Sequence, residues 1–404
     1  MRRIIADFGV KKELTQRRNG AKITHESQKS SWRLCALALI CFQVLEEPKM
    51  AKHRVLVAGL GHMGMSHAKA YARIPGFEVI GVCERRIADR ELPPELAAAR
   101  RFAKFEEALS ELKPDVVSIN TLPDTHAEFA IKAMEAGAHV FVEKPLAETA
   151  ESAERVVGTA QRTRRKLVIG YILRHHPSWI RFIEIARELG SPLVFRLNLN
   201  QQSSGANWDW HKRLMETFSP IVDCGVHYVD VMCQVAKSKP TRVQAIGVRL
   251  TDDIPKGMYN YGQLQVSFDD GSVGWYEAGW GPMMSETAFF VKDIIGPRGS
   301  VSIVMAEQSA DVKSDDINAH TKTNQILLHH AELQADGTFA RKDERIETTD
   351  EPDHDSLCER EQRFLLKAIE EDIDLTDHME DGVRSLKIVL AADESVRTGK
   401  IVAL

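Results

Sequence analysis

The sequence lacks the features of disulfide-stapled, zinc-finger and membrane-spanning proteins. It has only six cysteines in 404 residues, at positions 35, 41, 83, 224, 233 and 358, and none form a Cys-x-x-Cys pair. A chain of this length can bury a core without cross-links, so we expect free thiols in a reducing compartment and a cytoplasmic protein. No apolar run is long enough to cross a bilayer, and we expect no membrane association.

The chain also has no large excess of positive or negative charge. The formal net charge is -5, which provides no broad basic surface, so we expect no nucleic-acid partner. Histidine pairs occur at 175–176 and 329–330, but neither pair has acids or cysteines at metal-binding spacing. We therefore expect no metal.

Residues 1–50 differ from the rest of the chain. They are rich in lysine and arginine and then carry a short apolar patch, "LCALALICF". Three interpretations remain: an export signal, a disordered extension, or translation that starts at Met50, a few residues before the first expected strand. The position of Met50 favours the last.

A glycine motif follows directly. The segment "HRVLVAGLGHMGMSHAKAYARI" begins with a β-branched apolar run and ends in a helical pattern, with G-x-G-x-x-G spacing between them. This context is typical of a dinucleotide-binding fold. Gly59 permits a tight turn, Gly61 lets the backbone approach a pyrophosphate, and Gly64 lets helix and strand pack closely. His62 and Met63 lie in the same loop and are also candidate cofactor contacts.

The end of the next expected strand indicates which cofactor is bound. "FEVIGVCE" ends at Glu84, twenty residues after Gly64, where an acid can accept hydrogen bonds from the adenosine ribose of NAD. Arg85 and Arg86 follow at once and could instead hold the 2′-phosphate of NADP. The spacing favours NAD, with NADP possible.

Strand and helix patterns alternate through residues 51–172. Strand-like runs at 115–120 and 139–145 flank a helical pattern at 124–137. This alternation predicts a Rossmann domain with a doubly wound parallel sheet that binds ligands at the carboxyl ends of its strands. The motifs "NTLPDTH" and "EKP" lie at such ends. There Lys144 could donate to a substrate oxygen and stabilise charge on it.

A second acid–base pattern lies further along, in "DCGVHYVD". On one helix, Asp223, His227 and Asp230 would share a face, because residues i, i+4 and i+7 stack. The face is either a solvated polar stripe or a proton-transfer pair over a substrate. Histidine suits the second role near neutral pH.

Residues 173–404 read as a substrate-binding and oligomerisation domain of the α+β class. Consecutive strand-like runs predict a large open, mostly antiparallel sheet, with "DDGS" as a hairpin turn and Gly399 as the stop of the last helix. The segment "NWDWHKR" is expected to be a loop. Its Trp208 suits a sugar face, plain packing or a subunit contact equally.

The order of these motifs resembles the Gfo/Idh/MocA oxidoreductase family. The resemblance runs from about residue 53 to the C-terminus and rests on "GLGHMG", "TLPDTH", "AGAHVFVEKP", "GYILRHHP" and "DCGVHYVD". The first motif is generic to dinucleotide folds, whereas EKP combined with D-x-G-x-H is specific. One departure is "METFSPIVD", which stands where many members carry a glycine-rich run and which could reshape the substrate pocket.

The resemblance implies roles for individual residues. Lys144 would bind the reacting hydroxyl, His227 would be the general base, and Asp223 would bind and orient the substrate. Arg174 matches a family arginine near the substrate at the domain junction. The cofactor cleft would further be lined by Thr121, Leu122, His126 and Glu143.

The resemblance also implies a function. We expect an NAD(P)-dependent dehydrogenase that oxidises a secondary hydroxyl of a sugar, inositol or related polyol, as a homodimer or homotetramer through the second sheet. One alternative is a redox-neutral glycoside hydrolase that holds NAD tightly. The other is a non-catalytic NAD(P)-sensing regulator, which would be expected to lack the equivalents of Lys144 or His227.

Overall fold

The computed structural model describes residues 52–404 except 287–290, 305–313, 315, 317–320, 322 and 349–350. The expectations for residues 1–50 therefore lie outside the described residues. Within the described part, the cysteines at 83, 224, 233 and 358 are buried free thiols, as expected. No helix in this part has the length and apolarity that a membrane span requires.

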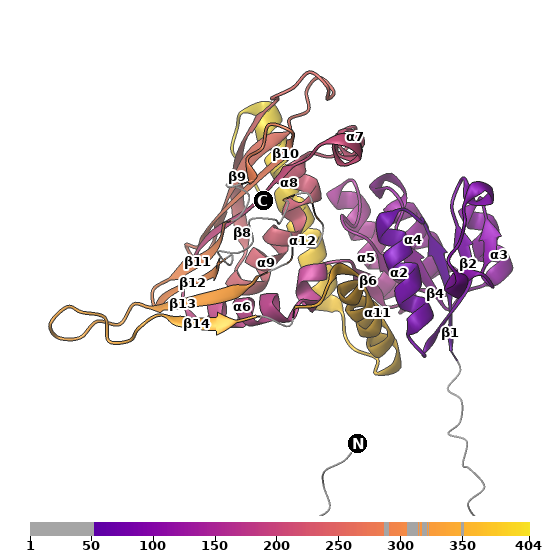
Figure 1. Cartoon of the computed structure of the whole chain (residues 1–404), viewed down its shortest axis with the longest axis horizontal. Helices are drawn as coiled ribbons and strands as arrows, with labels where there is room; N and C mark the ends of the chain where they lie inside the picture. The colour runs from indigo at the N-terminus through magenta and orange to yellow at the C-terminus, as the bar shows by residue number, and fades with distance from the viewer. Residues whose placement is uncertain are drawn as a thin grey trace, which may run out of the picture. The chain divides into compact units, whose positions relative to one another are not determined.

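The first sheet has six parallel strands in the order β3-β2-β1-β4-β5-β6 (Figure 1). This is the strand order of the doubly wound dinucleotide fold, so the fold prediction is confirmed. The strands are β1 (His53–Ala58), β2 (Phe77–Cys83), β3 (Arg100–Phe102), β4 (Val116–Ile119), β5 (His139–Val142) and β6 (Leu167–Ile169).

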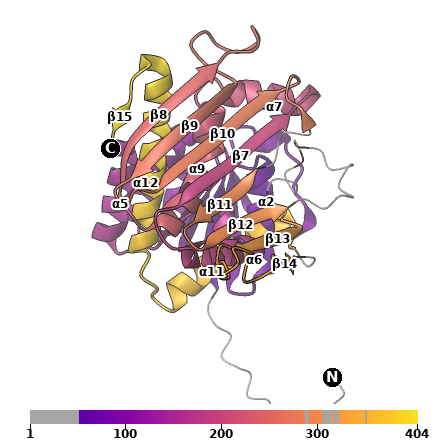
Figure 2. The ribbon, with the colours of Figure 1, turned by 90° about the vertical axis from the view of Figure 1, so that its left-hand side faces the viewer.

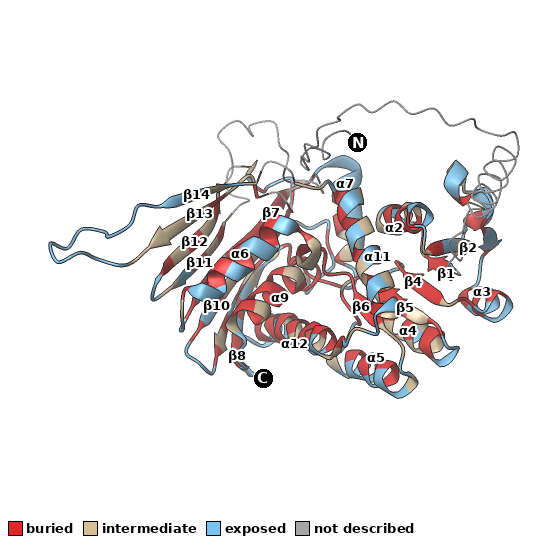
Figure 3. Ribbon diagram, turned by 90° about the horizontal axis from the view of Figure 1, so that it is seen from below, coloured by how far each residue is buried: buried red, intermediate tan, exposed pale blue. Residues whose placement is uncertain are grey.

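Helices cover both faces of this sheet, which explains why its central strands are continuous apolar runs. The helices are α2 (His62–Arg73), α3 (Phe105–Leu112), α4 (His126–Glu135), α5 (Ala150–Thr163) and α11 (His354–Glu370). Val55 and Val57 of β1 share a core cluster with buried residues of α2 and α11. Leu56 and Ala58 point the other way, into a cluster with α3, α4 and α5. Figure 3 shows the strands buried and the outer sides of the helices exposed.

The second sheet has nine strands in the order β14-β13-β12-β11-β7-β10-β9-β8-β15. All of its pairs are antiparallel except β7 with β10. The strands are β7 (Val194–Gln202), β8 (Pro240–Val248), β9 (Tyr261–Phe268), β10 (Val273–Gly281), β11 (Lys292–Gly296), β12 (Gly299–Val304), β13 (Gln325–His330), β14 (Glu344–Glu347) and β15 (Val402–Ala403). The open, mostly antiparallel sheet is as predicted.

Helices pack on one face of the second sheet, and Figure 2 looks onto the other face. The covering helices are α6 (Pro177–Glu188), α8 (Pro220–Asp223), α9 (Gly225–Ala236) and α12 (Thr376–Thr398). The strand pairing places five exposed apolar side chains on the face away from these helices, namely Val194, Ile246, Val248, Val273 and Ile295.

Local predictions from turn and helix signals had mixed outcomes. Gly271, in the "DDGS" turn between β9 and β10, has φ +87°, and Gly399, after α12, has φ +68°, so both occupy the left-handed region as expected. The predicted loop at 207–213 is wrong, because these residues lie in helix α7 (Gly205–Leu214). The single helix expected for "DCGVHYVD" is also wrong: α8 ends at Asp223 and α9 begins at Gly225.

A buried cluster of ion pairs connects three elements of the chain. Arg174, in the short turn η4 (Ile172–His175), donates from Nε to Asp230 Oδ2 at 2.8 Å and from Nη2 to Asp381 Oδ2 at 3.1 Å. Asp230 comes from α9 and Asp381 from α12, and both are buried. Although burial raises the pKa of Asp230, the Arg174 guanidinium opposes that shift and favours the carboxylate.

We predict that Arg174→Ala lowers the free energy of unfolding by about 3–5 kcal/mol, because Asp230 would lose its counter-ion while remaining buried. Urea denaturation followed by circular dichroism measures the change. Arg181→Ala is the control, since Arg181 pairs with exposed Glu184 and should cost less than about 1 kcal/mol. Equal losses in the two variants would contradict the prediction.

Candidate functional site

The glycine loop after β1 is built for close backbone approach. A Cβ on Gly59, which has φ +83°, would lie 2.4 Å from Asn120 O, and one on Gly64 would lie 2.0 Å from Gly59 O. Neither position tolerates a side chain. A Cβ on Gly61 would meet nothing within 4 Å, and no side chain caps the first turn of α2. The loop therefore leaves open space beside uncapped N–H groups, which suits a pyrophosphate. His62 is exposed and Met63 half-buried at this turn.

Glu84 follows β2, beside a cavity of about 430 Å³ that it lines with Arg85 and Arg86. Its carboxylate accepts a hydrogen bond from Arg90 Nη1 at 2.8 Å. Arg85 and Arg86 are exposed. The residues at the position expected for the adenosine of the cofactor are thus one acid and three arginines. The sequence reading did not include Arg90, because an arginine six residues after the acid lies outside the motif.

The segment after β4 is held by His126, which is buried. Its Nδ1 lies 2.8 Å from Pro145 O and its Nε2 lies 3.1 Å from Thr121 O. Burial lowers the pKa of His126 despite these carbonyls. The ring thus joins the turns after β4 and β5, while Thr121 is half-buried and Leu122 is exposed.

The turn after β5 is fixed by a buried contact between Glu143 and His67 of α2. Glu143 Oε1 lies 2.8 Å from His67 Nε2, and Glu143 Oε2 accepts the Lys144 backbone N–H at 3.1 Å. Burial alone would raise the pKa of Glu143. The His67 hydrogen bond and nearby positive charge, including that of Lys144, instead lower this pKa to about 2. Glu143 is therefore an anion that holds the turn.

Lys144 reaches from this turn to the second half of the chain. Its Nζ donates to Asp223 Oδ1 at 3.0 Å and to the Asp223 carbonyl at 3.2 Å. Burial disfavours the ammonium, but the negative charges of Asp223 and Glu143 and the hydrogen bond to Asp223 act together against it and raise the pKa of Lys144. The side chains are 19% and 12% exposed, so the pair is partly open rather than sealed in the core.

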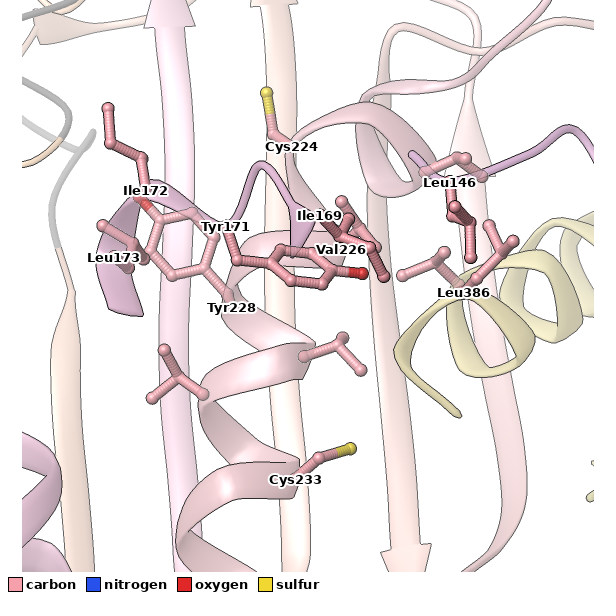
Figure 4. Close-up of a cluster of buried hydrophobic side chains, with 14 of the residues drawn as sticks. Leu146, Ile169, Tyr171, Ile172, Leu173, Cys224, Val226, Tyr228, Cys233 and Leu386 are labelled. Atoms are coloured by element: carbon pink, nitrogen blue, oxygen red, sulfur yellow. The ribbon is translucent and has the colours of Figure 1, made fainter. Parts of the chain in front are cut away.

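His227 lies in the first turn of α9, just after Asp223. Residues 221–230 are all buried except His227, which is half-buried. Its ring meets the edge of Tyr171 with a centroid separation of 6.0 Å. Figure 4 shows Tyr171 packed among the buried side chains around α9, including Val226 and Tyr228. The apolar cluster thus supports α9 from behind, while His227 keeps an accessible side. The structure brings Lys144 and Asp223 into contact, and a positive charge on His227 would act on Glu143, the residue before Lys144.

Two residues expected at the substrate occupy different environments. The Arg174 guanidinium is engaged by Asp230 and Asp381, as described above, so its direct contribution to substrate binding is not apparent. Trp208 is buried on α7, with Lys212 Nζ 5.8 Å from its ring centroid. Of the three roles considered for Trp208, this burial favours packing.

Several polar residues near Asp223 were not identified from the sequence. Gln201 Oε1 accepts from Trp280 Nε1 at 2.7 Å and from Cys224 Sγ at 3.6 Å. Lys292 is buried, donates to the Asn198 carbonyl and lies 4.5 Å from the Tyr228 ring centroid, and burial lowers its pKa well below the usual value. These residues lie on strands whose polar members follow no recognisable motif.

The expectation of no metal was based only on the histidine pairs and on cysteine spacing. The structure nevertheless brings together donor atoms of His67, Cys358 and Glu361, all buried and within 4.8 Å of one another. The signal in the sequence was the spacing of Cys358 and Glu361 on one helix face.

Comparisons with known families agree with this geometry. The sequence model described as "Oxidoreductase family, NAD-binding Rossmann fold" (GFO_IDH_MocA) matches residues 53–171. The model of the "GFO/IDH/MocA C-terminal domain" matches residues 184–302.

Curated relatives are named either as dehydrogenases or as glycosyl hydrolases. UDP-N-acetylglucosamine 3-dehydrogenase of Acidithiobacillus ferrooxidans is 31% identical over 207 residues, which are 50% of this chain and 61% of the relative. Inositol 2-dehydrogenase of Salmonella typhimurium is 27% identical over 182 residues, 44% of this chain and 52% of the relative. A glycosyl hydrolase family 109 protein of Shewanella baltica is 33% identical over 132 residues, 30% of this chain and 29% of the relative. The chain therefore spans about half the length of the first two.

Solved structures share the fold across most of the chain. The WlbA dehydrogenase of Chromobacterium violaceum, in complex with NADH and UDP-GlcNAcA, gives a TM-score of 0.69 at 20% identity, over 90% of this chain and 99% of that one. Scyllo-inositol dehydrogenase of Lactobacillus casei, with NAD(H) and scyllo-inositol, gives 0.66 at 19% identity, over 87% and 99%. With both sheets and both family models in agreement, the chain belongs to the Gfo/Idh/MocA oxidoreductase family, and residues 53–171 are its NAD-binding Rossmann fold.

Proposed function

We propose that the chain is an NAD-dependent dehydrogenase that oxidises a secondary hydroxyl of a sugar, inositol or related polyol. The observation that carries the proposal is the partly open Lys144–Asp223 pair at the carboxyl end of β5. Ligands of parallel α/β sheets bind at that edge. His227 follows in the next turn and supplies a base of suitable intrinsic basicity.

The residues present fit a nicotinamide dinucleotide. The open space at Gly61 and the uncapped N–H groups of α2 suit the pyrophosphate, and Glu84 suits the ribose hydroxyls. When bound, NAD supplies the hydride acceptor, which no protein side chain can provide. Glu84 favours NAD, whereas Arg85, Arg86 and Arg90 leave NADP possible.

Three side chains would perform the proton chemistry. Lys144 donates a hydrogen bond to the reacting hydroxyl oxygen and stabilises negative charge on it as the C–H bond breaks. The hydrogen on carbon leaves with both electrons of the C–H bond, as hydride. His227 removes the hydroxyl proton as the carbonyl forms. Asp223 holds Lys144 in place and orients the substrate. Glu143, locked by His67, keeps the turn that carries Lys144 rigid.

The substrate class is supported by the relatives. The names UDP-N-acetylglucosamine 3-dehydrogenase and inositol 2-dehydrogenase both denote dehydrogenases of ring polyols or sugars. A redox-neutral glycosidase is the second candidate, because relatives named glycosyl hydrolase family 109 protein match part of the chain. Release of a glycoside's leaving group without net NAD reduction would identify it.

The uncovered face of the second sheet is proposed as the surface for homodimers or homotetramers. Val194, Val273 and Ile295 are paired neighbours on β7, β10 and β11, and Ile246 and Val248 continue the apolar surface on β8. An exposed apolar patch of this kind is typical of a protein interface.

We predict that Lys144→Ala and His227→Ala each reduce turnover at least about a hundredfold while NAD affinity stays nearly unchanged, because both residues act on the substrate hydroxyl. Absorbance of reduced nicotinamide measures turnover on a panel of aldoses, inositols, sugar acids and amino sugars, with NAD and NADP offered separately. Lys387→Ala is the control, since Lys387 is paired with Glu154 at the protein surface. Wild-type turnover in either site variant would remove that residue from the mechanism.

We predict that Glu84→Ala raises the KM for NAD about tenfold and improves NADP use, because the ribose loses an acceptor and Arg90 is released. Initial rates with each cofactor measure the preference. Glu78→Ala serves as the control, since Glu78 is exposed at the opposite end of β2. Unchanged preference would assign selectivity to the arginines.

We predict that Ile246→Lys shifts the protein to a smaller oligomer, because Ile246 is 60% exposed on the proposed interface and a buried charge would oppose association. Size-exclusion chromatography with light scattering measures the mass. Leu333→Lys, at a site 57% exposed on the loop after β13, should leave the mass unchanged. An unaltered mass for Ile246→Lys would exclude this part of the face.

A further inference from the structure

Helix α11 presents three potential metal ligands on one face. His354, Cys358 and Glu361 are spaced by four and three residues, which places them on the same side of the helix. That side packs against α2, which carries His67, and Figure 1 shows the two helices next to each other. The proposed dehydrogenase chemistry uses none of these side chains as a substrate contact.

The donor atoms converge in the interior. One ligand atom each of His67, Cys358 and Glu361 lies within 4.8 Å of the others, and these residues are 0%, 0% and 1% exposed. In the part of the chain that the structure describes, no other group of three histidine, cysteine or acidic side chains comes as close. Coordination of one ion would require the donor atoms to move closer together than they lie here.

Glu361 gives the independent indication of a ligand. Both of its carboxylate oxygens are buried, and neither has a hydrogen-bond partner among the described residues. Burial of an unpaired carboxylate costs several kcal/mol, so such a group either keeps a proton or faces a cation. A cation between Glu361 and Cys358 would remove this cost.

His67 is already oriented as a metal-ligating histidine would be. Its Nε2 faces the Glu143 carboxylate at 2.8 Å, and with the proton on Nε2 the lone pair is on Nδ1. A carboxylate behind a histidine is the usual arrangement that orients an imidazole towards a metal. Gln362 Nε2 now donates to Nδ1 at 2.9 Å, while Gln362 Oε1 is unpaired. Binding an ion at Nδ1 would displace only this one neutral hydrogen bond.

We propose that His67, Cys358 and Glu361 bind a divalent transition ion, of which zinc is the best match to one nitrogen, one sulfur and one oxygen donor. A thiolate and a carboxylate would neutralise the 2+ charge, as a buried site requires. The nearest further donor is His354, whose ring nitrogens lie 3.8 and 3.9 Å from Cys358 Sγ. The ion would be structural: it would join α11 to α2 and, through His67 and Glu143, support the turn that carries Lys144.

The test uses the untagged full-length chain, purified without chelators. Mass spectrometry of metal content should find about one zinc per chain, and zinc added to chelator-stripped protein should raise the thermal midpoint. Cobalt in place of zinc should give a thiolate-to-cobalt charge-transfer band. Cys358→Ser should abolish that band, and Cys358→Ser and Glu361→Gln should each weaken zinc affinity at least about tenfold.

Cys233→Ser is the matched control, because Cys233 is a buried free thiol of α9 that is not among the three donors. It should keep zinc stoichiometry, affinity and the cobalt band. The proposal is overturned if stripped wild-type protein shows no zinc-dependent shift. It is equally overturned if Cys358→Ser binds zinc as wild type does, since the ion would then lie elsewhere in the chain. None of these readouts depends on the proposed dehydrogenase activity.

Discussion

The buried hydrogen bond between His67 and Glu143 is the interaction on which the candidate site depends. It links α2, which begins at the glycine loop, to the turn after β5, which carries Lys144. Because both side chains are buried, water does not weaken the hydrogen bond, and the two side chains keep one relative orientation. Glu143 therefore fixes the turn from which Lys144 reaches Asp223. The glycine loop and the residues proposed for proton transfer are thus held by one set of contacts.

The architecture could be predicted because its signals are local and periodic. The glycine spacing, the apolar strands and the alternation of strand and helix each follow from the packing of a sheet covered on both faces. The break between Asp223 and Gly225 could not be predicted in the same way, because a single glycine such as Gly225 weakens a helix without ending it. Helix α8 packs against α12 and β10 at this point. The helix around Trp208 was missed for a similar reason, since mixed aromatic and polar residues show no clear apolar stripe.

Site residues were predictable where chemistry is tied to a motif and not where it depends on distant partners. Lys144 and His227 belong to short patterns, and the structure gives both a partly accessible position near Glu143 and Asp223. Arg174, by contrast, pairs with acids 56 and 207 positions away, and sequence spacing carries no trace of such contacts. The same limit hid the contact of His67 with Cys358 and Glu361, whereas Arg90 was missed because it lies outside the cofactor motif.

The position of α11 has a consequence for synthesis of the protein. One apolar face of the first sheet, around Val55 and Val57, is completed by Leu365 and Ala368, which are synthesised long after that sheet. The dinucleotide fold therefore emerges early but stays incompletely covered on that side until α11 has been made. During this interval the nascent chain presents an uncovered sheet face, which is a hazard for aggregation and a natural target for chaperones. A protein truncated before α11 would carry that exposure permanently.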